Sequence, residues 1–478
     1  MNRRKSGPAG TRRLRIRMYR SGLGDCFLLS IPSGSATRHM LIDCGVITGT
    51  EKAEAVMAEI AQDIKRETGD KLDYVVATHE HWDHVSGFIQ AKKIFDTIEF
   101  GTVLMAWTEN PRDRLAQKLK KDHETRLSAL RNVHLRLQKQ PGATALTSGL
   151  GSILGFWGDC AATGGTTTAA AMDYLKNRPT RGVRYCKPEE KPLELEGLDG
   201  VRIYVLGPPR NETEIRKVNP STRNPETYSR LAAASVDFYL PGMQEPAAGP
   251  AREKATAWAM PFDAYFAIDE SDAAQDPFFQ KYYGKDTGDE AFRRIEDDWL
   301  GVADELALAL DNATNNTSLA LAIEIIETGD VLLFPGDAQV GNMLSWDALS
   351  WRQKSPAGTA ARTVSFSELI GRTAVYKVGH HGSHNATLRE KGLERIDNRD
   401  LVALLPVDEA MAHGKRWDMP FPPLFERLQQ KTGGRIIRCD SGVPQKPAVA
   451  AGSVLTGQEW KKFQDAVKTA DRYVDYYI

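Results

Sequence analysis

A short run of metal-binding side chains, residues 78–84 (THEHWDH), constrains this chain more than any other stretch. The six residues before it (LDYVVA, 72–77) are apolar and β-branched, which predicts a buried strand. Apolar residues then recur at roughly helical spacing over 85–95, so the run lies on a strand-to-helix loop. On such a loop His79 and His81 converge on one ion, whereas on a helix they would point to different sides. Imidazole and carboxylate ligands suit Zn²⁺ and, less selectively, Mn²⁺ or Fe²⁺.

The alternative interpretation of this run is a polar loop that happens to be rich in histidine. The whole chain has only ten His residues, and three of them lie here beside an aspartate. We therefore take His79, His81, Asp83 and His84 as candidate metal ligands.

Composition excludes several other classes of protein. Hydrophobic residues make up 41% and charged residues 26% of the 478 residues, a normal balance for a globular chain with a sizeable core. With a net charge of −1, the chain as a whole is not attracted electrostatically to nucleic acid or to an anionic membrane. The five Cys residues are scattered without a C-x-x-C pair, so we expect no disulfide framework and no thiolate zinc site, as in a reducing cytosol.

The N-terminus and the hydropathy pattern bear on localisation. Residues 1–12 are basic and no apolar core follows them, so we expect a disordered tail and no secretory signal. No apolar run approaches the ~20 residues that a membrane-spanning helix needs. We therefore expect a cytoplasmic protein that makes no membrane contact.

The H-x-H-x-D-H run after an apolar strand resembles the signature of the metallo-β-lactamase-fold hydrolases. The Gly-x-Gly-Asp turn at 22–25 and the Gly-His-His-Gly-Ser run at 379–383 are most similar to the soluble hydrolase domain of the competence-protein (ComEC/Rec2-like) branch. These motifs span most of the chain, from about Gly22 to His384. Competence proteins place this domain beside a membrane channel, which this chain lacks, so DNA transport is not implied. The resemblance implies an α+β fold: an αββα sandwich in which helices flank two mixed β-sheets.

We expect a single domain of this kind over residues 13–478, with helical or irregular insertions at about 108–190 and 210–300. The first insertion includes a long helical stretch, 112–140, with nine basic residues against three acidic ones. We favour a solvated helix face there over a basic arm that guides a phosphate-bearing substrate. The second insertion has no clear strand pattern, as in a lid, a substrate loop or a partly disordered segment. Residues 458–476 read as a C-terminal helix.

Two later segments complete the ligand set that the resemblance implies. Asp337 follows a predicted strand and a Pro-Gly step, and in the family the acid at this place bridges two ions. By itself, Gly-Asp after a strand indicates a turn more often than a ligand. Of His380 and His381, one should bind metal. By analogy with a Gly-His step after a strand we favour His380 as the ligand, with His381 facing the substrate, and the reverse assignment stays open.

The same resemblance implies residues that surround and orient the metal ligands. The family has an aspartate at the place of Asp43 that usually braces the metal loop, although alone this residue reads as an ordinary turn acid. Ser383 and His384 belong to the surroundings of the metal. Many relatives carry another metal-binding His ahead of the bridging acid, but this chain has none in that region; the matching place is Asn315 or Asn316.

We therefore predict two unequal sites for divalent ions, with zinc as the expected metal and manganese as the alternative. One ion would take Asp83, His84, Asp337 and a C-terminal His. The other, more labile ion would take His79, His81 and Asp337, completed by water or an amide oxygen. A bridged pair of ions lowers the pKa of a shared water and supplies hydroxide at neutral pH. Asp83 or the non-ligating His would handle the proton.

The resemblance favours phosphodiester substrates, so we expect a phosphodiesterase or nuclease that acts on nucleic acid or a nucleotide. The second hypothesis is hydrolysis of a lactone, thioester or amide in a small molecule. The third is a partner-binding or sensor protein with a vestigial site, and the intact ligand set argues against it. The sequence leaves any protein partners unknown.

Overall fold

The computed structural model describes residues 13–138, 144–158, 167–218, 220–221, 226–228, 268, 270–273, 275–283, 303–353, 362–415, 417–446 and 455–478. The predicted tail at 1–12, Cys160 and much of the second predicted insertion lie outside these residues. The chain divides into two compact units. The first comprises Met1–Gln117, Gly155–Ala232 and Asn312–Ile478, and the second comprises Lys118–Leu154 and Ala233–Asp311. The second unit therefore draws on parts of both predicted insertions.

The first unit contains an eight-stranded mixed sheet in the order β15-β16-β1-β2-β3-β4-β5-β6. Strands β3 to β6 run parallel to one another, and the other neighbours are antiparallel. Strand β4 is buried along nearly its whole length, as its continuous apolar sequence predicts. The strands are β1 (Arg15–Tyr19), β2 (Cys26–Ser33), β3 (Ala36–Cys44), β4 (Lys71–Ala77), β5 (Glu99–Ala106), β6 (Val183–Cys186), β15 (Val467–Thr469) and β16 (Tyr473–Tyr477).

A second mixed sheet has six strands in the order β14-β13-β12-β9-β8-β7. Strands β9, β12, β13 and β14 are parallel, whereas β7, β8 and β9 pair antiparallel. A separate hairpin joins β10 (Ser350–Gln353) to β11 (Arg362–Ser365). The strands of the six-stranded sheet are β7 (Val201–Gly207), β8 (Ala320–Ile325), β9 (Val331–Phe334), β12 (Thr373–Lys377), β13 (Val402–Leu405) and β14 (Ile436–Arg438).

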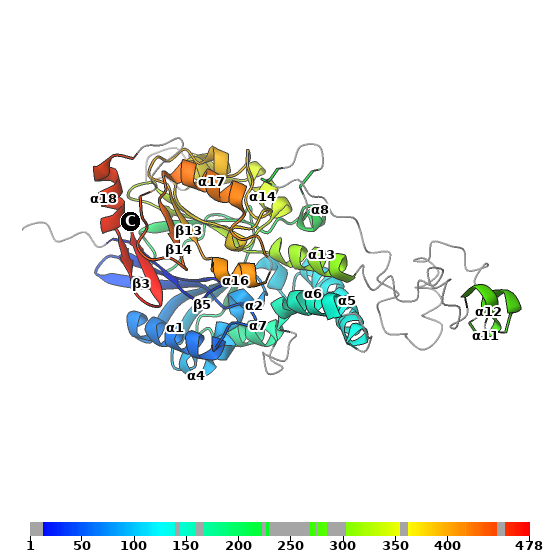
Figure 1. Cartoon of the computed structure of the whole chain (residues 1–478). Coiled ribbons are helices and arrows are strands. Elements are labelled where there is room, and N and C mark those ends of the chain that lie inside the picture. The colour runs from blue at the N-terminus through cyan, green and yellow to red at the C-terminus, as the bar shows by residue number, and fades with distance from the viewer. Residues whose placement is uncertain are drawn as a thin grey trace, which may run out of the picture. The chain divides into compact units, whose positions relative to one another are not determined.

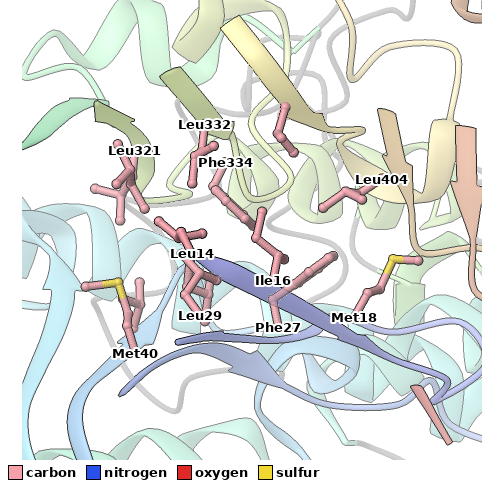
Figure 2. Close-up of a cluster of buried hydrophobic side chains, with 14 of the residues drawn as sticks. Leu14, Ile16, Met18, Phe27, Leu29, Met40, Leu321, Leu332, Phe334 and Leu404 are labelled. Atoms are coloured by element: carbon pink, nitrogen blue, oxygen red, sulfur yellow. The ribbon is translucent and has the colours of Figure 1, made fainter. Parts of the chain in front are cut away.

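The main hydrophobic core lies between these two sheets (Figure 2). Phe27 of β2 and Phe334 of β9 meet edge to face, with 5.6 Å between ring centroids. Successive residues of β1 alternate between the two faces of the sheet. Ile16 and Met18 point into the inter-sheet core, and Tyr19 packs in the second core on the other face. Other members of the inter-sheet core are Leu14, Leu29, Met40, Leu321, Leu332 and Leu404.

Helices cover the outer faces of the sheets (Figure 1). On the eight-stranded sheet, apolar residues of α1 (Ala53–Thr68) and α7 (Thr168–Asn177) join the second core. On the six-stranded sheet, α14 (Val340–Ser345), α15 (Phe366–Gly371) and α17 (Pro422–Thr432) contact the strands. This helix–sheet–sheet–helix order confirms the predicted αββα sandwich. Shorter helices of the first unit are α2 (Trp82–Val85), α3 (Gly87–Gln90), α4 (Lys92–Phe95), α8 (Glu212–Arg216), α16 (Glu409–Gly414) and α18 (Gly457–Asp465).

The chain end corrects one expectation. Only α18 is helical in the predicted C-terminal helix, and the chain then forms the β15–β16 hairpin. Strand β16 pairs antiparallel with β1 along its full length, from Tyr473 opposite Tyr19 to Tyr477 opposite Arg15. The edge of the sheet thus offers backbone partners that override the local helical pattern.

The described part of the second unit is built from helices. It contains most of α5 (Arg114–Leu137), all of α6 (Thr144–Leu154), α11 (Glu270–Ala273) and α12 (Pro277–Tyr283), and most of α13 (Ala303–Asn315). Helix α5 corresponds to the predicted basic stretch that lacks Pro and Gly. Within the part of the chain described above, no helix combines the length and apolar character that crossing a bilayer requires.

Candidate metal centre

The ends of four strands in the first unit bring the candidate ligands to one place. Strand β4 is followed by residues 78–84, here called the metal loop, and β3 carries Asp43 next to its end. Strand β9 leads through Pro335-Gly336 to Asp337, and β12 leads to the 3₁₀ turn His380–Gly382. Gly336 has φ +60°, and a side chain there would press against Ser318 and the metal loop. The fold thus makes neighbours of residues that lie far apart in the sequence.

Two groups of potential ligand atoms share Asp337. His79, His84 and Asp337 form the first group, and Asp83, Asp337 and His381 form the second. Within each group the ligand atoms lie within 4.8 Å of one another. All five side chains are at most 2% exposed. The arrangement offers two adjacent places for a cation with one carboxylate between them.

His81 joins this cluster through His79. Nδ1 of His79 lies 3.1 Å from the Thr78 hydroxyl and 3.2 Å from the Ser318 hydroxyl. Its Nε2 is thereby turned toward His81, whose Nδ1 lies 3.0 Å away. Two imidazole nitrogens at this separation are within reach of a single cation.

Asp43 fixes the orientation of His84. Its carboxylate accepts hydrogen bonds from the backbone N–H of Thr78 (2.8 Å) and the Thr78 hydroxyl (2.7 Å). The same carboxylate lies 2.8 Å from Nδ1 of His84. With Nδ1–H donating to Asp43, Nε2 of His84 faces Oδ2 of Asp337 at 3.1 Å. Asp25, Asp43 and His84 also lie close enough together to suggest a third cation site. We do not propose one, because Nδ1 of His84 and the Asp43 carboxylate are already hydrogen-bonded to each other.

His380 and His381 take different directions, and both have positive φ, 44° and 53°. Nδ1 of His381 lies 2.6 Å from the carbonyl oxygen of Pro406, to which it donates. Its Nε2 therefore points into the cluster, 3.0 Å from Oδ2 of Asp83. His380 instead places Nδ1 3.0 Å from the Ser383 hydroxyl. The structure thus places His381 rather than His380 among the potential ligands, the reverse of the assignment that the sequence favoured.

Oδ1 of Asp83 is buried without a hydrogen-bond partner, and Nε2 of His84 and Oδ2 of Asp337 contact each other at 3.1 Å but have no other partner. Burying polar atoms with so few partners is costly. Because these three residues belong to the two groups, the donor set fits divalent cations.

The pKa values of the cluster also indicate that its residues can hold cations. Burial by itself would lower the pKa of His84, but Asp337, Asp25 and Asp43 outweigh it and raise that pKa well above its usual value. Burial would raise the pKa of Asp83, but His84 and His381 lower it to about 2. In the metal-free protein, protonated imidazoles therefore sit between carboxylates, in positions that cations could take over.

Residues 21–134 match the family model described as the metallo-beta-lactamase superfamily. This segment is therefore similar to that superfamily. Proteins of the superfamily are generally metal-dependent hydrolases that often bind zinc. No curated protein matches the chain. The matched segment includes Asp43 and the metal loop, and the fold brings Asp337 and His381 to them from beyond it.

Asn315, Asn316 and His384, which the sequence analysis placed around the metal, also lie outside the ligand groups. Asn316 uses its side chain to bind backbone: its amide donates to the carbonyls of Ile215 and Lys217, and its oxygen accepts from two N–H groups near α14. His384 is exposed and its ring lies against Phe421. Asn315 is fully buried at the end of α13.

Ser318, Asp25 and Lys377 belong to the site but were not predicted. Ser318 contacts His79 and also accepts the backbone N–H of Asp337 at 3.1 Å. Lys377 contacts Asp25 and Asp337 and is 1% exposed. A sequence signal existed for Lys377, because a lysine that ends an apolar strand just before a predicted ligand segment needs a buried partner.

Proposed function

We propose that this metallo-β-lactamase domain is a dinuclear metal-dependent hydrolase that cleaves phosphodiesters. The observation that carries the proposal is the shared carboxylate: Asp337 belongs both to the group with His79 and His84 and to the group with Asp83 and His381. A single acid shared by two ligand groups can hold two cations close enough for two-metal hydrolysis.

In this proposal His79, His81 and Asp337 would hold one cation, and Asp83, His84, Asp337 and His381 would hold the other. Nε2 of His84 lies 3.1 Å from Oδ2 of Asp337 and 3.8 Å from Oδ2 of Asp83. The nitrogen and oxygen ligands favour zinc and accept manganese. When bound, two such cations polarise the bond to be cleaved and lower the pKa of water at the site.

We propose that the side chain of His380 contacts the substrate. It is 8% exposed, more than any of the ligands. The Ser383 hydroxyl donates to Oδ1 of Asn385 at 3.0 Å, so it accepts the Nδ1–H of His380 and leaves Nε2 as an acceptor. Burial lowers the pKa of His380 to about 4, which keeps the ring neutral near neutral pH. A neutral, oriented imidazole beside the ligand groups suits contact with a substrate hydroxyl or a leaving group.

Charge supports an anionic substrate. Asp43, Asp83 and Asp337 are buried in the cluster, while the fourth carboxylate, Asp25, pairs with Lys377. Before a bound water loses its proton, two divalent cations would exceed the charge of those three carboxylates by one. That surplus suits a phosphodiester monoanion better than a neutral lactone or amide, and the similarity of the 22–25 and 379–383 motifs to the competence-type hydrolases supports the same choice.

The test compares wild-type protein with His81→Ala on bis-p-nitrophenyl phosphate, on single-stranded DNA and RNA, and on a lactone and a thioester. Each assay is run with Zn²⁺ or Mn²⁺ added to chelator-treated protein. We expect diester cleavage that needs metal and is lost in His81→Ala. Turnover of the lactone or thioester without diester cleavage would contradict the proposed substrate class. If no ester is turned over at all, the proposal that this protein is a hydrolase is contradicted.

A further inference from the structure

Lys377 is a buried cation at the end of β12 whose ammonium group is fully used. It contacts the carboxylate of Asp25, the carbonyl oxygen of Gly336 at 2.9 Å and Oδ1 of Asp337 at 3.0 Å. An ammonium group has three N–H donors, so each has an acceptor. The side chain therefore has one defined position beneath the metal centre.

Asp25 supplies the balancing charge from the opposite sheet. It directly precedes β2 of the eight-stranded sheet and is 2% exposed. Its backbone N–H donates to the carbonyl oxygen of Asp83 at 3.0 Å, and its own carbonyl accepts from Gly45 at 3.1 Å. The Asp25–Lys377 pair thus joins the metal loop to the six-stranded sheet without adding net charge.

The pair determines which oxygen of Asp337 is available. Oδ1 accepts hydrogen bonds from Lys377 and from the backbone N–H of His380, both at 3.0 Å. Two donors occupy the lone pairs of this oxygen. Oδ2 accepts from neither of these donors and lies 3.1 Å from Nε2 of His84. Only Oδ2 therefore remains for both ligand groups.

We propose that Lys377, neutralised by Asp25, is a positioning residue that holds Oδ1 of Asp337 and leaves Oδ2 as the oxygen that would serve both ligand groups. The inference rests on the proposed dinuclear function. An unpaired ammonium this close to the centre would repel cations, and Asp25 removes that penalty. The paired lysine therefore donates a hydrogen bond to Asp337 without repelling the cations.

A purely structural role for the pair makes a different prediction. Removing one member of a buried ion pair leaves an uncompensated charge and destabilises a protein strongly, whereas replacing both members is often neutral. If the pair only joins the two sheets, the double variant Lys377→Met/Asp25→Asn should recover both stability and metal binding. If Lys377 positions Asp337, the double variant should recover stability but not metal affinity.

The experiment titrates Zn²⁺ into chelator-treated full-length protein against a chromophoric chelator, with thermal unfolding of the metal-free protein measured in parallel. We expect the double variant to unfold near the wild-type temperature and to bind zinc about 10–100-fold more weakly, the usual range for loss of a group that orients a ligand. The single variant Lys377→Met should unfold at a lower temperature than the double variant.

Arg17→Met is the matched control. It also removes a buried cation, but the carboxylates paired with Arg17, Asp63 and Asp475 among them, lie outside the ligand groups. Its zinc affinity should equal that of the wild type. Wild-type zinc affinity in the folded double variant would overturn the positioning role while leaving the proposed function intact. A wild-type protein that binds no zinc would instead overturn the proposed function itself.

Discussion

At the scale of single residues, two adjacent histidines show how backbone conformation separates roles that the sequence leaves open. His380 and His381 follow the same strand, and the Gly-His-His-Gly run alone gives no reason to prefer one as a ligand. Positive φ at both residues turns their rings apart, a conformation that costs energy for residues other than glycine and that recurs at functional sites. The Pro406 carbonyl then orients His381 and Ser383 orients His380, and neither partner can be identified from the local sequence.

The two histidines should therefore respond differently to substitution. We expect His381→Gln to lose about one of two bound ions and His380→Gln to keep both, because only His381 faces the second ligand group. Diester turnover should fall about 10²–10⁴-fold in His380→Gln, the usual contribution of a proton-transfer group. Metal content by mass spectrometry and steady-state rates check this pair of variants. Loss of metal in His380→Gln alone would restore the assignment that the sequence favoured.

The protonation state of the cluster predicts how metal binding depends on pH. In the metal-free protein, burial opposes protonation of His84 and His381, but the surrounding carboxylates outweigh it and raise the pKa of both. A cation needs the unprotonated nitrogen, so zinc binding must release protons and weaken as the pH falls through these raised pKa values. The carboxyl of Asp83, with a pKa of about 2, contributes no proton release near neutral pH.

Calorimetric titration of Zn²⁺ into metal-free protein measures this release directly. At about pH 7 the observed heat should differ between buffers of unlike ionisation enthalpy, by an amount that corresponds to at least about one proton per chain. Equal heats in all buffers would show that the imidazoles of the cluster are already neutral.

At the scale of elements, the strands were predictable where one physical signal dominates. The apolar run at 72–77 gave β4, and the short apolar runs before Asp337 and before His380 gave β9 and β12. The C-terminal hairpin was missed because its strands are stabilised by pairing with β1, which lies more than four hundred residues away in the sequence. The ion pair of Lys377 was not predictable either, because its partner Asp25 precedes a strand of the other sheet.

Close contact between elements makes Gly45 a sensitive position. A Cβ atom there would collide with the backbone carbonyl of Asp83 and the N–H of His84, so β3 can approach the metal loop only through a glycine. We expect Gly45→Ala to lower the free energy of unfolding by about 1–3 kcal/mol, as overpacking does, and to weaken zinc binding. Denaturant unfolding and zinc titration measure both effects.

Gly371→Ala is the control for this prediction. Gly371 ends α15 and a Cβ atom there would meet no heavy atom within 4 Å. Its stability and zinc affinity should stay near those of the wild type. An equally stable Gly45→Ala protein with unchanged zinc affinity would show that the metal loop can shift without cost.

At the scale of the whole molecule, the fold of the first unit gathers the candidate site from three distant parts of the chain. The metal loop, Asp337 and His381 follow strands of two different sheets, and the core between those sheets sets how the strand ends meet. Sequence reasoning identified the loop from its dense histidines and the later ligands from family resemblance. It could not predict the Asp25–Lys377 pair or Ser318, because these residues act through contacts between sheets.

The most direct test of this account is the zinc content of wild-type protein and of Asp337→Asn at saturating zinc, measured by mass spectrometry on folded protein. Asp337 is the one residue common to both ligand groups. We expect about two ions per chain in the wild type and fewer than about one in Asp337→Asn, since loss of the shared carboxylate weakens both positions. A wild-type protein that holds at most one ion, or an Asp337→Asn protein that still holds two, would contradict the account.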